Sequence, residues 1–178
     1  MIRLFAAIAI PEEIGEALRR RQQGLPGARW RTSEQLHLTL RFMGEVAEPV
    51  AEDLDAELAS IDGPALDLSL EGVGAFGEGG DIRAVWAGVT EDLALRQLAK
   101  RCEAAARRAG LAPEKRAWRP HVTLAYLRRA DPARVAAWIQ GHNLLKSPPF
   151  RVGAFGLYSS WRAGDASTYR LEASYPLG

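Results

Sequence analysis

The stretch His37-Leu38-Thr39-Leu40 returns 84 residues later as His121-Val122-Thr123-Leu124. The chain has only three histidines, so two of them stand in the same His-x-Thr-Leu pattern. A second repeat keeps the same order, because Val73-Gly74-Ala75-Phe76-Gly77 recurs as Val152-Gly153-Ala154-Phe155-Gly156. Two repeats in one order predict a duplicated unit that folds about a pseudo-twofold axis. Such an axis would bring the two histidines face to face across one cleft.

The segments around the motifs predict matching elements in the two halves of the chain. Alternating or apolar runs predict strands, which we expect at 2–10, 36–43, 66–76, 82–89, 120–127, 150–160 and 167–174. Apolar residues at helical spacing and terminal signals predict helices, which we expect from Pro11 to before Gly24 and at 49–60, 92–109 and 132–140. Each half then reads helix, His-Thr strand, helix and two strands, within one domain of two lobes that spans 1–178.

The composition is that of an ordinary globular protein, with 25% charged residues and a net charge of +1. One cysteine excludes an internal disulfide and any metal cluster built from cysteines. No run approaches the roughly 18 apolar residues of a membrane span. We therefore expect a cytoplasmic protein with no membrane partner, and we expect it to be a monomer.

Strand alternation predicts which side chains of the motifs face the cleft. Residues i and i+2 of a strand share a face, so His37 and Thr39 point the same way, and so does Arg41. The residues between them point into the core: Leu36, Leu38, Leu40 and Phe42.

The second motif repeats this arrangement, with His121 and Thr123 on one face. By the same alternation, Tyr126 points away from the cleft together with Val122 and Leu124. Each strand thus offers one imidazole and one hydroxyl, backed by apolar residues.

Two imidazoles and two hydroxyls suit a phosphoryl group. The hydroxyls can donate to non-bridging oxygens, one imidazole can remove a proton from a nucleophile, and the other can protonate the leaving oxygen. This needs one neutral and one charged histidine, which is accessible because an unperturbed imidazole has a pKa of about 6.5. The pattern does not decide which histidine is the acid and which is the base.

Other kinds of site have weaker support in the sequence. Zinc sites use three or four His, Cys or carboxylate ligands, and two histidines flanked by threonines do not fit that requirement, so we expect no metal. Cys102 lies on the apolar face of the helix expected at 92–109 and is predicted to be core. His142 has no threonine partner and is predicted to be a surface residue or a cation at a helix end.

The paired motifs resemble the signature of the 2H phosphoesterase superfamily, and the flanking sequence resembles its RNA 2′,3′-cyclic phosphodiesterases, once called 2′-5′ RNA ligases. The similarity runs nearly end to end. It includes an opening strand that begins at Arg3-Leu4-Phe5, the segment from Trp30 through His37 to Gly44, and a middle hairpin that begins at Gly72. It also includes the second motif at 119–125 and a closing hairpin at 157–169.

The resemblance implies an α+β fold of two lobes, with antiparallel sheets lining a central cleft and helices outside. It implies opening of a terminal 2′,3′-cyclic phosphate on RNA to a 2′-phosphomonoester without a metal or another cofactor. Carried over by position, His121 would activate water and His37 would protonate the leaving 3′-oxygen. Thr39 and Thr123 would hold the non-bridging oxygens.

The chain departs from the family pattern at one position. Many members carry a phosphate-binding arginine five residues after the second histidine, and Tyr126 stands there. Three arginines are candidates for a substitute: Arg41, Arg128 and Arg129. Three aromatic residues are candidates for stacking on a terminal base: Phe5, Trp30 and Phe76.

Several alternatives keep the same site but change its use. The site could join RNA ends through a 2′-5′ linkage, or it could act on a small cyclic nucleotide. A binding module for RNA ends without catalysis is a further alternative. Intact histidine and threonine at all four positions favour the enzyme, because binding alone does not require both histidines.

Overall fold

The computed structural model describes residues 1–178. The strands are β1 Ile2–Ala9, β2 Arg29–Trp30, β3 His37–Val46, β4 Leu66–Leu68, β5 Leu70–Phe76, β6 Ala84–Val89, β7 His121–Tyr126, β8 Phe150–Val152, β9 Ala154–Ala163 and β10 Ala166–Pro176. The helices are α1 Glu12–Arg19, α2 Glu48–Ala59, α3 Leu93–Arg108 and α4 Pro132–His142, with short 3-10 turns η1 Ser33–Gln35 and η2 Gly79–Asp81. No helix is long and apolar enough to cross a membrane.

One antiparallel sheet of eight strands dominates the fold. Seven strands follow the order β10-β9-β1-β3-β7-β6-β5, and the eighth, β2, pairs with β7. The sheet is narrow at its centre, because β3 and β7 pair only at Leu38 and Val122. This joint divides the molecule into a lobe around β3 and a lobe around β7, which confirms the predicted antiparallel α+β fold of two lobes.

Two pairs of directly opposed residues mark the pseudo-twofold axis. Leu38 lies opposite Val122, and in the separate two-stranded sheet Asp67 lies opposite Arg151. The partners in both pairs are 84 residues apart, which is the spacing of the two motifs. A twofold axis passes between directly opposed residues of an antiparallel pair, so both pairs lie on one axis of a duplicated unit.

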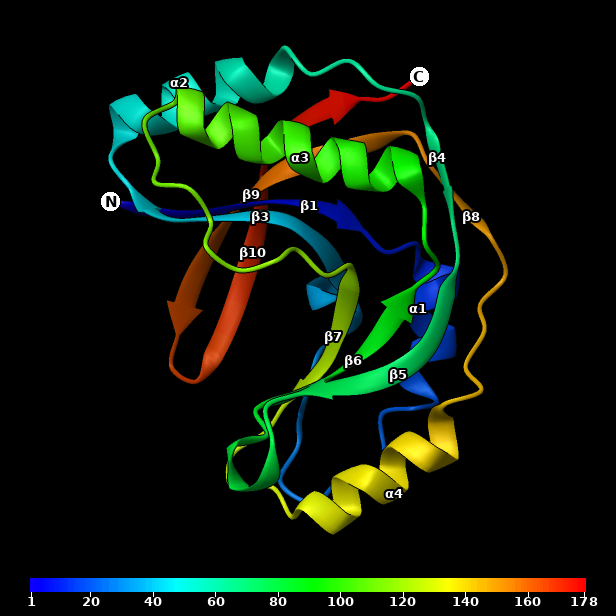
Figure 1. Cartoon of the computed structure of the whole chain (residues 1–178). Coiled ribbons are helices and arrows are strands. Elements are labelled where there is room, and N and C mark those ends of the chain that lie inside the picture. The colour runs from blue at the N-terminus through cyan, green and yellow to red at the C-terminus, as the bar shows by residue number, and fades with distance from the viewer.

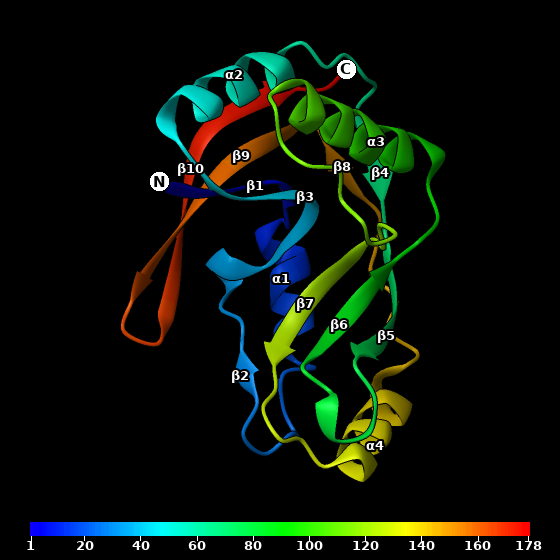
Figure 2. The ribbon, with the colours of Figure 1, turned by 60° about the vertical axis from the view of Figure 1, so that its left-hand side comes forward.

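The two lobes exchange elements. Helix α3, which connects β6 to β7, packs instead against β3 of the other lobe, beside α2 (Figure 1). Helix α1, which connects β1 to β3, lies behind β6 and β7, in the lobe that α4 also covers (Figures 1 and 2). The lobes are therefore not the two halves of the sequence, because the chain crosses between them several times.

The second sequence repeat does not match in space. Thr39 neighbours Ala7, which neighbours Gly156, whereas Thr123 neighbours Trp86, which neighbours Gly74. Gly74 therefore occupies the position equivalent to Gly156, whereas the sequence repeat aligns Gly74 with Gly153, three residues earlier. An odd displacement reverses the face of a strand residue. For that reason Phe76 borders the cleft, while Phe155 is 2% exposed in the core.

Two of the expected strands are each divided in two. The segment expected at 66–76 breaks after Leu68, so that β4 pairs with β8 while β5 pairs with β6. The segment expected at 150–160 breaks at Gly153, between β8 and β9. These two breaks let each segment contribute one strand to the main sheet and one to the small two-stranded sheet.

Helix α1 ends at Arg19, so that only the first of the three arginines expected in its last turn belongs to it.

Candidate active site

The joint between the lobes brings the two motifs together. His37 and His121 are the first residues of β3 and β7. Because Leu38 lies opposite Val122, the antiparallel register puts His37 opposite Thr123 and Thr39 opposite His121. All four side chains share the face that is turned away from Leu38 and Val122, both of which are fully buried. The predicted set of two imidazoles and two hydroxyls is thus assembled on one surface.

Each imidazole is held by the same backbone contact. Nδ1 of His37 lies 2.7 Å from the carbonyl oxygen of Gln35, and Nδ1 of His121 lies 2.7 Å from that of Arg119. A carbonyl only accepts, so each neutral ring carries its proton on Nδ1 and donates it there. The remaining nitrogen, Nε2, is then an acceptor in both rings. Both histidines are oriented alike for proton transfer through Nε2.

Aromatic rings surround both imidazoles. The His37 ring centroid lies 4.8 Å from that of Phe5 and 5.3 Å from that of Tyr169. The His121 ring lies edge-on to Phe76 at 4.7 Å. Phe5 and Phe76 therefore lie at the site, as the sequence suggested. Trp30, the third aromatic candidate, lines the cavity beside His37 and packs its ring 6.2 Å from that of Trp138.

Burial lowers the pKa of both histidines. Desolvation is the main cause for His37, whose pKa falls to about 4, with smaller contributions from the charges of Arg31 and His121. Desolvation also lowers the pKa of His121. Without a bound anion, both rings are therefore neutral at physiological pH. The influence of His121 on His37 is that of two titratable groups sharing one site.

A β-bulge interrupts each motif strand at the same place. Ala7 pairs with Thr39 but Ala6 pairs with Arg41, so Leu40 is the extra residue of β3. Leu124 is skipped in the same way in β7. A bulge shifts the alternation by one residue, so Phe42 and Tyr126 turn to the cleft side. They are 57% and 37% exposed, and the predictions that these two rings point away from the cleft are wrong.

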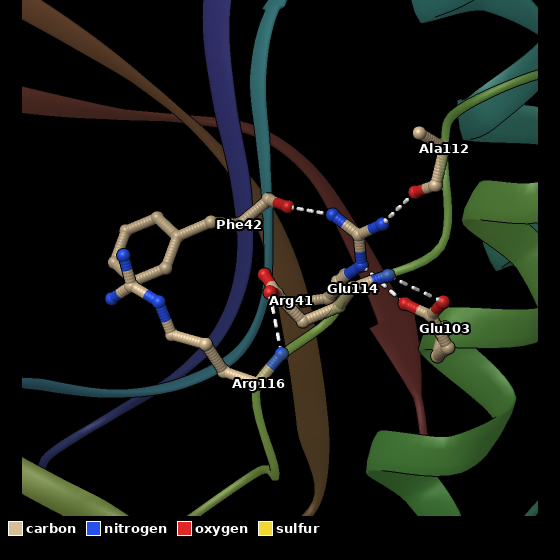
Figure 3. A network of polar contacts seen from close by, with 6 residues as sticks. All are labelled: Arg41, Phe42, Glu103, Ala112, Glu114 and Arg116. Atoms are coloured by element: carbon tan, nitrogen blue, oxygen red, sulfur yellow. Dashed lines mark hydrogen bonds and ion pairs between the residues drawn. The ribbon is translucent and has the colours of Figure 1, made fainter.

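The same bulge removes Arg41 from the cleft, so the prediction that it faces the substrate is wrong. Its side chain is 9% exposed and forms an ion pair with Glu103 of α3. It also donates to the carbonyl oxygens of Phe42 and Ala112, the latter at 2.7 Å (Figure 3). Arg41 therefore ties β3 to α3 and to the segment after it.

The other two candidate arginines lie away from the histidines. Arg129 lines a different cavity with Leu25 and Asp131, near the start of α4. Arg128 is an exposed residue of the turn after β7. Cys102 is fully buried, as predicted, and burial raises its pKa to about 12. His142 is the basic residue in the last turn of α4, and burial lowers its pKa.

A large cavity lies beside His37. Its volume is about 640 Å³, and its walls come from β1, β2, β3, the end of β7 and the β9–β10 hairpin. Figure 2 shows this hairpin extending away from the sheet toward the viewer's left. The charged groups of the walls are four arginines and one acid: Arg3, Arg29, Arg31, Arg162 and Asp165. His121 does not line this cavity.

Arg31 is a site residue that the sequence reasoning missed. Its guanidinium carbon lies 5.0 Å from the ring centroid of Tyr126, and it donates to the Tyr169 hydroxyl at 2.5 Å. Arg31 belongs to the short segment that places β2 beside β7, a pairing between residues far apart in sequence. Hydrophobic periodicity cannot predict a pairing between segments so far apart in sequence. The only signal for this segment was the family resemblance, which begins at the neighbouring Trp30.

The chain is similar to known proteins of one family in both sequence and structure. Residues 10–164 match the 2′-5′ RNA ligase superfamily. The RNA 2′,3′-cyclic phosphodiesterase of Escherichia coli is 35% identical over 171 residues, which cover 94% of this chain and 92% of that protein. The enzyme of that name from Aeropyrum pernix is 42% identical over 98 residues, 54% of this chain and 56% of its own length. The crystal structure of E. coli LigT complexed with 3′-AMP has a TM-score of 0.81 at 30% identity, covering 99% of this chain and 98% of LigT.

Proposed function

The chain belongs to the 2′-5′ RNA ligase superfamily, and on this premise we propose that it hydrolyses a terminal 2′,3′-cyclic phosphate of RNA to a 2′-phosphomonoester. The observation that carries the proposal is the matched pair of imidazoles. Both are fixed through Nδ1 and both have Nε2 free, on one face with two threonine hydroxyls. The names of the similar enzymes supply the substrate class.

The reaction divides into two proton transfers. Nε2 of His121 takes a proton from water, whose oxygen attacks phosphorus. The P–O3′ bond breaks, and Nε2 of His37 gives a proton to the departing O3′. The hydroxyls of Thr39 and Thr123 donate to the two non-bridging oxygens as their charge grows. Two imidazoles and two hydroxyls thus supply every proton transfer and charge contact, and the scheme needs no metal ion.

The position of the cavity supports this choice of acid and base. In an in-line displacement the leaving oxygen departs opposite to the attacking water, and O3′ stays on the ribose of the RNA. The nucleoside must therefore lie on the side of the acid. The only one of the two histidines that lines the large cavity is His37, so the RNA has room on the side of His37 and water approaches from the side of His121.

The low pKa of His37 suits a general acid that becomes protonated only when substrate is bound. The bound phosphate is an anion, and a unit charge at about 4 Å is worth roughly 4 kcal/mol at an effective dielectric constant near 20. This attraction offsets the desolvation that lowers the pKa of His37. Burial also lowers the pKa of His121, which favours the neutral ring that a general base requires.

The test is turnover of a short RNA that ends in a 2′,3′-cyclic phosphate, in excess EDTA. We expect the wild type to form the 2′-phosphate, and we expect His121→Ala to form it at least about 10²-fold more slowly at the same enzyme concentration. Formation of a 3′-phosphate would refute the assignment of O3′ as the leaving group. Loss of wild-type turnover in EDTA, restored by a divalent metal, would refute the metal-free scheme.

A further inference from the structure

The cavity beside His37 is built to bind an anion. Four arginines and a single carboxylate, that of Asp165, supply its charged groups. Three aromatic rings also line the walls, those of Phe5, Phe42 and Tyr126. Arginines with aromatic faces are typical of sites that bind single-stranded nucleic acid, because the cations meet phosphates and the rings stack on bases.

Arg31 is the most constrained of these arginines. Its backbone N–H donates to the carbonyl of Leu124 at 2.8 Å, and its own carbonyl accepts from Nε2 of Gln22 at 2.8 Å. Its guanidinium lies against the Tyr126 ring and donates to the Tyr169 hydroxyl. No carboxylate forms an ion pair with it. Arg31 is thus a fixed cation whose remaining N–H groups are free for an anion in the cavity.

We propose that this cavity holds the RNA strand on the 5′ side of its cyclic end, and that Arg31 binds the first internucleotide phosphate. This proposal rests on the proposed function, because the reaction places the ribose on the side of His37. The ribose that carries the cyclic phosphate continues through its 5′-oxygen to that next phosphate. The strand therefore runs from His37 into the cavity, where Tyr169 contacts both the His37 ring and the guanidinium of Arg31.

The position of Arg31 separates it from the reacting phosphate. A group that held the reacting phosphate would lie between the two imidazoles. Arg31 instead lines the cavity that His37 lines and that His121 does not. Tyr169, which contacts the His37 ring and accepts from Arg31, lies on the same side. Arg31 therefore serves the strand and not the P–O bond that breaks.

The experiment compares two substrates that share the reacting group. One is adenosine 2′,3′-cyclic phosphate, and the other is the diadenosine dinucleotide with the same cyclic end and one internucleotide phosphate. We expect Arg31→Gln to raise KM for the dinucleotide about tenfold more than for the mononucleotide. Arg31→Lys keeps the charge and should recover part of this difference, and Arg107→Gln, an exposed arginine of α3, should alter neither substrate.

Calorimetry with the 2′-phosphorylated products measures the affinity of the cavity for the strand in the absence of turnover. We expect wild type to bind the dinucleotide product more tightly than adenosine 2′-phosphate, and Arg31→Gln to lose that advantage. An equal loss for both ligands, or no loss for either, would overturn the proposal. Failure of wild type to hydrolyse either substrate would refute the proposed function instead, and these binding data would still decide whether Arg31 holds the phosphate.

Discussion

The two motif strands carry the same chemistry in different surroundings. His37 and His121 have the same backbone contact at Nδ1, and a bulge follows each of them at Leu40 and Leu124. After the bulge, however, β3 carries a buried arginine where β7 carries Ala125, and a large charged cavity opens beside His37 alone. Duplication thus places two imidazoles alike, and in the proposed mechanism their unequal surroundings decide which one acts as the acid.

The largest expected effect comes from removing either imidazole. His37→Ala and His121→Ala should each lower kcat by roughly 10²- to 10⁴-fold, because each removes one of two proton transfers. The double variant should be only slightly slower than the slower single variant, since the pair acts as a unit. Single-turnover assays on the cyclic-ended dinucleotide measure this. Wild-type kcat in either single variant would show that only one half of the site is used.

The threonines test whether the halves contribute equally to phosphate binding. Thr39→Val and Thr123→Val should each lower kcat by about 10²-fold, because each removes one donor to a non-bridging oxygen. The corresponding serine variants keep the hydroxyl and should retain most of the activity. A loss confined to one of the two valine variants would mean that the phosphate lies against one strand only.

Arg41 tests the structural difference between β3 and β7. Arg41→Met should lower the free energy of unfolding by about 2 kcal/mol, because it leaves Glu103 and two carbonyls without their charged donor. Urea unfolding measures this, with Arg107→Met on the exposed side of α3 as the control. If Arg41→Met unfolded like the wild type but had a raised KM, Arg41 would contact substrate in the cleft, which would contradict its buried position.

The last expected effect is the pH dependence of stability. The pKa of His37 in the folded state, about 4, is below its unfolded value of 6.5, so the unfolded chain binds more protons between these limits. Stability should therefore fall as the pH drops from about 6.5 to 4. His37→Asn should weaken this dependence more than His142→Asn, whose histidine lies at the end of α4. Equal slopes of Tm against pH in the two variants would contradict the stronger burial of His37.

The sequence predicted the parts of the site that depend on repetition and alternation. Both His-Thr pairs, their apolar backing and the two-lobe antiparallel fold follow from patterns of period two and from the repeated motif. The pattern failed beyond Leu40 and Leu124, because a bulge is set by the pairing partner and leaves no mark in the strand itself. That failure misplaced Arg41, Phe42 and Tyr126 together.

The remaining errors have a long-range cause. Arg31 reaches the site because β2 pairs with β7 and because Tyr169 comes from a hairpin 138 residues further along the chain. The repeat of Val73–Gly77 at 152–156 is a similarity of letters, which the register of β1 with β9 displaces by three residues. Pairings between distant strands are decided by the packing of the whole chain.

The most direct test of the division of labour between the two halves uses a dinucleotide with sulfur in place of the bridging 3′-oxygen of the cyclic phosphate. A thiolate leaves without a proton, so this substrate no longer needs a general acid but still needs a base. We predict that His37→Ala hydrolyses it at a rate close to that of the wild type, while His121→Ala remains at least about 10²-fold slower. Rescue of His121→Ala in place of His37→Ala would contradict the assignment of His37 as the acid on the side of the cavity.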